Sequence, residues 1–272
     1  EGLAPLGNDY LSILNEGYEN GWIDVMENEG KTSGAYSWGC YGTHPYVLLN
    51  YQDNVNNLYT VAHEMGHAIH TYLSNKNQPY SKAEYTIFVA EVASTLNENL
   101  LTQHLLSTLD DDKKRAYILN YYLEQFRGTV YRQTMFAEFE KIVHGMAEAG
   151  QPLTSESFSE VYKDLNVKYY GKDMVVDDEI SLEWARIPHF YSSFYVYKYA
   201  TGFCAATALT NQILNEGQTA VDRYIKFLSS GGSDYPINLL KEAGVDMTST
   251  DPINEALKTF SQMVDELEKI LL

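Results

Sequence analysis

Cysteine is nearly absent from this chain, which excludes the small secreted folds that depend on disulfide bonds. Cys40 and Cys204 are the only two cysteines among 272 residues, too few for a disulfide framework. The sequence also lacks any run of eighteen apolar residues, so it predicts no membrane-spanning helix. Both absences favour a protein of the reducing cytoplasm.

Basic residues are also scarce. Lysine and arginine number 19 against 37 aspartates and glutamates, which gives a net charge of −18. Such a charge repels nucleic acid and anionic membrane surfaces, although a local basic groove could still exist. We therefore expect neither a nucleic-acid partner nor a membrane partner.

An initiating methionine and a signal peptide are missing as well. The chain opens Glu1-Gly-Leu-Ala-Pro, which reads like the interior of a longer sequence, so we expect a processed or truncated polypeptide. No internal repeat or low-complexity segment occurs. With 44% hydrophobic and 21% charged residues, the chain can build a sizeable core in one large domain or two small ones. We expect a single domain over residues 1–272.

The most informative segment, residues 61–70, contains an H-E-x-x-H signature. His63 and His67 are four residues apart, so a helix places both imidazoles on one face, where they can bind one metal ion. Glu64 lies beside that face and could take a proton from a metal-bound water. The alternative is a helix with two structural or surface histidines. Gly66 costs about 1 kcal/mol relative to alanine inside a helix, which indicates that a neighbouring element packs closely there.

Two histidines leave a catalytic zinc ion one protein ligand short of the usual three. The histidine-bearing helix should cover residues 55–74, with a loop over residues 75–79 and a second helix from about Ser81. Glu91 lies on that second helix among small and apolar neighbours, where a charged group needs a partner. We therefore predict Glu91 as the third ligand, against the alternative of a solvated carboxylate.

Two more side chains could support these ligands. Glu98 follows Glu91 by seven residues on the same helical face and could accept a hydrogen bond from a ligand imidazole. His70 follows His67 by three residues and could play a similar part. Surface or core roles are the alternatives for both.

One segment has β character. Residues 31–51 are rich in aromatic and β-branched residues bounded by glycines, with Pro45 at a strand entrance. This pattern predicts two short strands joined by a glycine-bearing loop. The strands could simply cover the core, or one edge could pair with an extended peptide. His44 could face such a groove or satisfy a loop carbonyl.

The remaining apolar periodicity predicts helices rather than strands. The first should span residues 8–29, and residues 111–149 should form one long helix or two abutting helices. Thr154 or Ser155 could cap a helix that reaches about residue 170. The acidic residues 171–179 predict a loop whose aspartates could bind a cation but are more simply solvated. Two further helices are expected over residues 218–230 and 251–272.

A second informative segment, residues 186–202, is dense in aromatic residues, and its Pro188 suits a first helical turn. Since the chain has 23 tyrosines, the segment could be a tyrosine-rich core helix. It could instead serve catalysis, because peptide hydrolysis at zinc generates an oxyanion that gains from a phenolic or imidazole donor. His189 and a tyrosine such as Tyr191 or Tyr197 could supply these donors.

Four motifs follow one another along the chain. They are Gly30-Lys-Thr-Ser-Gly-Ala-Tyr-Ser-Trp-Gly, His63-Glu-Met-Gly-His-Ala-Ile-His70, Glu91-Val-Ala-Ser-Thr and Pro188-His-Phe-Tyr-Ser-Ser-Phe-Tyr-Val-Tyr-Lys-Tyr-Ala-Thr-Gly202. In this order they resemble oligoendopeptidase F, a branch of the thimet-oligopeptidase-like zinc peptidases, and the likeness spans most of the chain.

The resemblance implies a mainly helical, zincin-type catalytic domain with a small β-ribbon lining the substrate cleft. It implies one zinc ion per chain, bound by His63, His67 and Glu91, with Glu64 as the base that activates water. The substrate would be an oligopeptide.

The resemblance also implies substrate contacts. His189 and tyrosines of the aromatic motif would contact the substrate carbonyl or backbone, and among the tyrosines we favour Tyr197 over Tyr191 and Tyr195. The strand near residues 41–49 would line the channel. The substrate-binding residues predicted in that stretch are Gly42 and His44.

Members of this family are longer, with a large N-terminal helical part, so the resemblance implies that the chain is the catalytic C-terminal half. That helical part, or a second copy of the chain, would cover the cleft. The predicted function is that of a zinc endopeptidase for short oligopeptides. The alternatives are a zinc-bound module that binds peptides without cleaving them, and an interaction fragment without metal.

Overall fold

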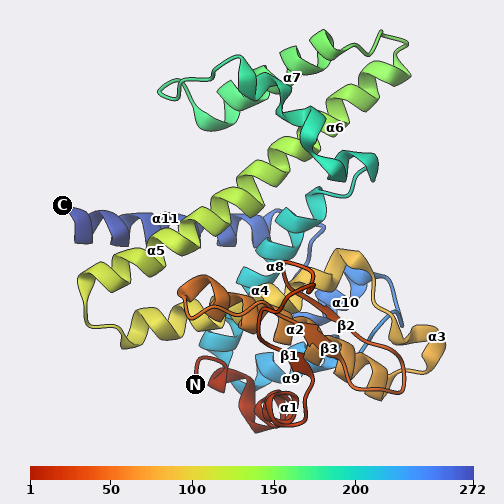
Figure 1. The fold of residues 1–272 in the computed structure, drawn as a ribbon, viewed down its shortest axis with the longest axis vertical. Coiled ribbons are helices and arrows are strands. Elements are labelled where there is room, and N and C mark those ends of the chain that lie inside the picture. The colour runs from red at the N-terminus through yellow and green to blue at the C-terminus, as the bar shows by residue number, and fades with distance from the viewer. The chain divides into compact units, whose positions relative to one another are not determined.

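The computed structural model describes residues 1–272 and consists mainly of helices with one three-stranded sheet (Figure 1). The predicted mainly α fold class with a small β element is confirmed. The chain divides into two compact units: unit 1 comprises Glu1–Leu123 and Gly202–Leu272, and unit 2 comprises Glu124–Thr201. No helix in the structure combines the length and the apolar character needed to cross a membrane.

Unit 1 holds most of the helices and the whole sheet. Its helices are α1 (Gly7–Glu19), α2 (Val55–Asn77), α3 (Tyr80–Ala83), α4 (Ile87–Thr108), most of α5 (Asp112–Phe126) and of α8 (Tyr197–Glu216), α9 (Gln218–Leu228), α10 (Pro236–Ala243) and α11 (Asp251–Leu271). Its strands are β1 (Ile23–Asp24), β2 (Tyr36–Trp38) and β3 (Tyr46–Leu48).

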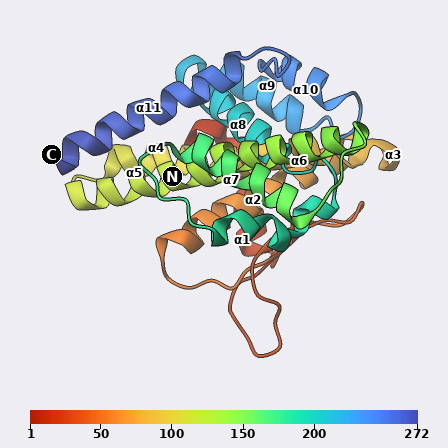
Figure 2. The same cartoon turned by 90° about the horizontal axis from the view of Figure 1, so that it is seen from above.

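Unit 2 is built on two helices that run side by side in Figures 1 and 2, α6 (Arg132–Glu148) and α7 (Ser155–Tyr170). A π-helical turn, Arg127–Tyr131, joins α5 to α6. The predicted helical stretch over residues 111–149 is therefore continuous apart from that turn. Thr154 caps α7 by accepting a hydrogen bond from the Ser157 backbone N–H, as its sequence position predicts.

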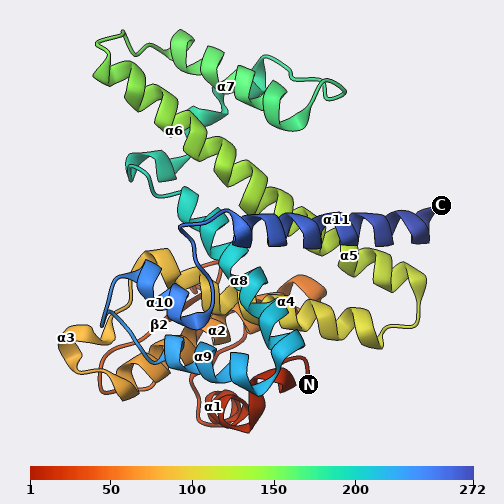
Figure 3. The same cartoon turned by 180° about the vertical axis from the view of Figure 1, so that it is seen from behind.

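The core of unit 1 forms where α2 packs against α4. Met65 and Ile69 of α2 are completely buried, as are Val92 and Leu96 of α4. Helices α8, α9 and α10, which Figure 3 shows from behind, contribute alanine, leucine and aromatic side chains to the same core. Burying these apolar faces supplies most of the driving force that fixes α2 beside α4.

The two central helices approach each other closely at Gly66. A Cβ atom there would lie 2.7 Å from the carbonyl oxygen of Ala93 and 2.7 Å from the Cα of Ser94. Both are backbone atoms of α4 and cannot rotate away. The close packing predicted from the glycine is confirmed.

We expect Gly66→Ala to destabilise the protein by about 1–3 kcal/mol, the usual range for overpacked interiors. Gly145 in α6 is the matched control, since an added Cβ there meets no atom within 4 Å, and alanine should stabilise that helix by up to about 1 kcal/mol. Urea denaturation measures both changes. A Gly66→Ala midpoint equal to that of wild type would contradict the close packing.

The first helix is shorter than expected. The prediction of a helix over residues 8–29 is wrong beyond Glu19, because Gly21 adopts a φ of +73° and turns the chain. Trp22 then enters the core with 2% exposure, and its carbonyl accepts a hydrogen bond of 2.8 Å from the Val47 N–H. The chain after the turn forms the short strand β1.

The two strands predicted within residues 31–51 are present as β2 and β3, which pair antiparallel with Ser37 opposite Val47. Strand β1 pairs parallel with the other side of β3, so the sheet order is β1-β3-β2. Val47 is buried, whereas Trp38 and Tyr46 on the opposite face are 75% and 53% exposed. The sheet thus packs on the core with one face and leaves β2 as an edge.

The structure corrects two further expectations. The helix expected from Ser81 is interrupted, since α3 ends at Ala83 and α4 begins at Ile87. The aromatic segment over residues 186–202 is not one core helix. It forms a short 3₁₀ turn, Pro188–Tyr191, and joins α8 only at Tyr197.

Candidate active site

Helix α2 presents His63 and His67 on one face, with ring centroids 4.8 Å apart. Glu91 of α4 completes the cluster: its Oε2 lies 3.4 Å from the Nε2 of His63 and 3.5 Å from the Nε2 of His67. The three ligand atoms all lie within 4.8 Å of one another. Their side chains are partly exposed, at 17–29%, so a solvent-borne ion can reach them.

The spacing of these atoms suits a shared cation. Two ligands of a tetrahedral zinc ion are about 3.3 Å apart when each metal–ligand bond is about 2.0–2.1 Å long. Direct N–H···O hydrogen bonds are shorter, typically about 2.7–3.2 Å. The observed separations of 3.4 and 3.5 Å match the first geometry better. His63, His67 and Glu91 could therefore hold a divalent metal ion.

Glu98 contacts the Nδ1 side of the His63 ring. The Nδ1 of His63 donates a hydrogen bond to the Glu98 Oε1, which leaves the Nε2 of the same ring directed at Glu91. This is the arrangement by which an outer carboxylate fixes the tautomer of a metal-binding histidine. Burial disfavours the charged imidazole of His63, but the hydrogen bond and the charge of Glu98, with the charges of Glu91 and Glu64, raise its pKa to about 9.

Ser94 supports the Glu91 side chain, a role that the sequence analysis did not predict. Its Oγ donates a hydrogen bond of 3.0 Å to the Oε2 of Glu91, the same oxygen that faces both histidines. Burial would raise the pKa of Glu91, but His67, His63 and Ser94 together lower it to about 2. The signal available in the sequence was a hydroxyl three residues after Glu91, on the same helical face.

Glu64 lies on α2 between the two histidines and is 7% exposed. Burial raises its pKa above the ordinary value, while the charges of His63 and His67 act in the opposite direction. The charges of three carboxylates, those of Glu64, Glu91 and Glu98, thus all act on the His63 imidazole. Such a concentration of negative charge favours a cation among them.

Comparison with known proteins assigns the chain to a protein family. The profile of peptidase family M3 matches residues 6–259. The chain belongs to this family. It is 61% identical over all 272 residues to oligopeptidase PepF of Bacillus subtilis and 48% identical over 271 residues to group B oligopeptidase PepB of Streptococcus agalactiae. The resemblance to oligoendopeptidase F is confirmed.

A solved relative agrees with this M3 assignment. The crystal structure of oligoendopeptidase-F from Enterococcus faecium matches 99% of the chain with a TM-score of 0.76 and 41% identity. The M3 chain covers 42% of that structure, and 41% and 45% of the Bacillus and Streptococcus proteins. It therefore spans a little under half the length of the relatives that it matches.

His70 is the third histidine of α2 in this M3 chain. It is buried, and it takes no part in the contacts among His63, His67 and Glu91 described above. It is 1% exposed and stacks on Tyr85 with ring centroids 3.7 Å apart. Burial and the charge of His67 lower its pKa to about 3. His70 is thus a neutral core histidine, and its support of the ligands stays a prediction.

His44 contacts the sheet and its own loop. Its ring stacks on Trp22 with centroids 5.6 Å apart, and its Nδ1 donates a hydrogen bond of 2.7 Å to the carbonyl of Pro45. Gly42, in the loop between β2 and β3, is exposed and adopts a φ of +87°, which favours glycine. Substrate binding by His44 and Gly42 stays a prediction.

The aromatic candidates belong to unit 2, whereas the metal-binding candidates belong to unit 1. His189, Tyr195 and Tyr199 form a ring cluster with centroid distances of 5.6–6.1 Å. Tyr191 is 92% exposed and Tyr197 is 38% exposed. Tyr199 is a member of this cluster that the sequence analysis did not single out.

The acidic loop after α7 is engaged with protein groups. Asp178 pairs with Lys163 at 2.5 Å, and the Oδ1 of Asp177 accepts a hydrogen bond from the backbone N–H of Ile180. These contacts account for Asp177 and Asp178 without a cation.

Proposed function

We propose that the protein is a zinc-dependent endopeptidase that hydrolyses internal bonds of short oligopeptides. The observation that carries this proposal is the convergence of His63, His67 and Glu91 around one point beside Glu64, in a chain of peptidase family M3. The matched relatives are called oligopeptidases, which supports peptides as the substrate class.

One zinc ion per chain would be held by the Nε2 atoms of His63 and His67 and by the Oε2 of Glu91. When bound, zinc would act as a Lewis acid and lower the pKa of a coordinated water to about 7. Glu98 would hold the His63 ring, and Ser94 would hold the Glu91 carboxylate. These two contacts would keep the ligands in place before metal arrives.

Glu64 would serve as the general base and then as the general acid. Its carboxylate would accept a proton as water attacks the scissile carbonyl carbon, and would pass that proton to the departing amine nitrogen. A carboxylate can serve both transfers, because it accepts a proton from water as a base and releases the same proton as an acid. General acid–base catalysis of this kind is typically worth about 10²- to 10⁴-fold.

His189 and a tyrosine, with Tyr197 preferred over Tyr191 and Tyr195, would donate hydrogen bonds to the carbonyl oxygen as it gains negative charge. One such donor typically contributes about 2.7–4 kcal/mol to catalysis. The strand within residues 41–49, β3, would line the substrate channel together with Gly42 and His44 in the loop before it. The exposed edge strand β2 beside it would pair with the substrate backbone.

The remaining expectations are part of the same proposal. We treat units 1 and 2 as one catalytic domain. We place the enzyme in the cytoplasm, because both of its cysteines are free thiols. Its net charge of −18 argues against a nucleic-acid partner.

Oligopeptides blocked at both ends provide the test. Incubation with the zinc-loaded protein should yield two fragments that each keep one blocked end, identified by mass spectrometry, because an endopeptidase does not need free termini. Peptide that is bound but recovered whole would favour the non-hydrolytic binding module instead.

Removal of Glu98 is expected to weaken zinc binding. Glu98→Ala should raise the dissociation constant for zinc by about 10- to 100-fold, as loss of an outer histidine partner typically does. Glu98→Gln should have a smaller effect, because its amide oxygen still accepts the His63 N–H. Competition with a fluorescent chelator measures both constants. Equal affinities for wild type and Glu98→Ala would show that Glu98 does not hold the ligand.

A further inference from the structure

Unit 2 contains one residue in an unfavourable backbone conformation. Phe194 has a φ of 55° and is the only non-glycine residue of the chain with a positive φ. A side chain with a Cβ is disfavoured in this left-handed region. Phe194 lies in the turn that links the 3₁₀ turn Pro188–Tyr191 to α8, so the strain falls within the aromatic segment.

A buried carboxylate meets the same turn. Glu140 of α6 is 3% exposed, and its Oε2 accepts a hydrogen bond of 2.8 Å from the Phe194 backbone N–H. Its Oε1 is buried without a hydrogen-bond partner. Burial raises the pKa of Glu140, while the Phe194 N–H, His144 and Lys198 act in the opposite direction. An unpartnered buried carboxylate oxygen is unfavourable in itself.

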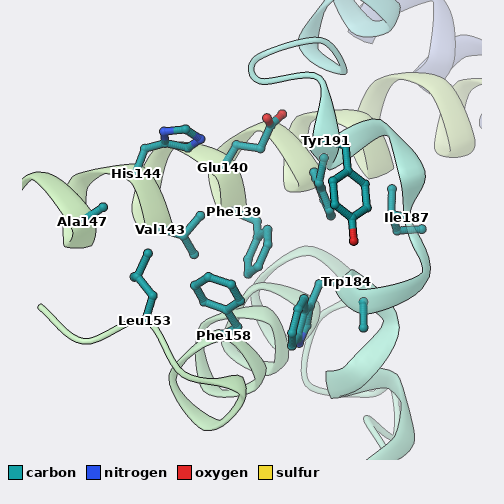
Figure 4. Close-up of a pocket in the computed structure, with 12 residues that line it drawn as sticks. Phe139, Glu140, Val143, His144, Ala147, Leu153, Phe158, Trp184, Ile187 and Tyr191 are labelled. Atoms are coloured by element: carbon teal, nitrogen blue, oxygen red, sulfur yellow. The ribbon is translucent and has the colours of Figure 1, made fainter.

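Glu140 also borders a cavity of about 360 Å³ lined by aromatic and aliphatic side chains, shown in Figure 4. In that view its carboxylate extends away from the rings of Phe158 and Trp184. Because the free Oε1 is also closed off from solvent, this carboxylate is directed at the protein and not at a ligand in the cavity.

The turn connects directly to the ring cluster. The Ser192 N–H bonds the His189 carbonyl at 3.0 Å, and the Tyr195 N–H bonds the Ser192 carbonyl at 3.1 Å. The rings of His189 and Tyr195 are then 5.8 Å apart. The backbone direction at Phe194 therefore helps to set where these two side chains lie.

We propose that Glu140 is a positioning residue, whose hydrogen bond to the Phe194 N–H holds the left-handed turn that orients His189 and Tyr195. Two unfavourable features, a strained φ and an unpartnered buried oxygen, meet at this one hydrogen bond. Strain of this kind persists where the surrounding structure enforces it, and it clusters at functional sites. The inference rests on the proposed function for the statement that His189 and Tyr195 serve hydrolysis.

Three variants test the contact. Glu140→Ala should lower kcat by about 10- to 100-fold with a smaller change in KM, the size of loss expected when catalytic groups are misplaced by about 1 Å. Glu140→Gln keeps an acceptor oxygen and should remain near wild type. Glu140→Ala combined with Phe194→Gly should regain part of the lost kcat, because glycine adopts the turn without strain.

Two structural readouts accompany the kinetics. Hydrogen exchange of the Phe194 amide should accelerate in Glu140→Ala, and the imidazole NMR signals of His189 should shift in that variant but not in Glu140→Gln. Val143→Ala is the control, since Val143 lines the same cavity from the same helix. It should leave kcat and the His189 signals unchanged.

The outcomes separate the two proposals. Faster exchange at Phe194 with unchanged His189 signals or unchanged kcat would overturn the positioning role. An equal loss in Val143→Ala would also overturn it, because activity would then follow the packing of the cavity. If wild type hydrolyses no peptide, the proposed function fails, and the His189 signals alone decide whether Glu140 orients that ring.

Discussion

Glu64→Gln is expected to lower kcat/KM for peptide hydrolysis by about 10²- to 10⁴-fold, the usual contribution of a general base. Glutamine has nearly the same shape but cannot accept the proton from water. Glu64 is only 7% exposed, so bulk solvent cannot readily replace it. Zinc content should stay at one ion per chain, because Glu64 is not among the three converging donors.

Steady-state kinetics with an internally quenched peptide and metal analysis of the same sample measure both quantities. Glu84→Gln is the control, because Glu84 is an exposed carboxylate that ends α3. Its kcat/KM should equal that of wild type. Near-wild-type hydrolysis by zinc-loaded Glu64→Gln would exclude Glu64 as the base.

Glu91→Ala is expected to abolish stable zinc binding and, with it, hydrolysis. The substitution removes the only anionic donor of the cluster, which lies 3.4 and 3.5 Å from the two imidazoles. The loss of affinity should exceed the 10- to 100-fold that is typical for an outer partner of a ligand. Metal analysis after gel filtration should give a value near zero ions per chain.

Thermal unfolding provides an independent measure of the same effect. Zinc at a hundredfold excess over its dissociation constant should stabilise the wild type by about 2.7 kcal/mol, since it binds only the folded chain. It should not stabilise Glu91→Ala. His104→Ala is the control. The Nε2 of His104 lies 3.7 Å from the Glu1 carboxylate, but no third metal-binding side chain joins this pair, so its removal should leave zinc binding unchanged. Stoichiometric zinc in Glu91→Ala would contradict the proposed ligand set.

The sequence predicts those parts of the site that depend on local geometry. His63 and His67 meet because four residues make about one helical turn, and Gly66 marks the helix crossing because only a residue without a Cβ fits there. Glu91 stood out as a charge among small and apolar neighbours. These inferences need only the period of a helix and the cost of burying charge.

Features that depend on distant partners were not predictable in this way. The segment that forms β1 was predicted as helix because Trp22 and Val25, which flank the strand, continue the helical spacing. Only the turn at Gly21 and the pairing with β3 decide otherwise. The contact between Glu140 and Phe194 joins residues 54 positions apart. Neither residue is unusual in the sequence, since the strain exists only in the folded turn.

Peptide hydrolysis by the 272-residue chain, before and after removal of metal, tests the central proposal most directly. The proposal predicts that the chain cleaves an internally quenched peptide, loses this activity in chelator, and regains it when about one equivalent of zinc is restored. Cleavage that persists in the metal-free protein, or a zinc-loaded chain that leaves the peptide intact, would contradict it.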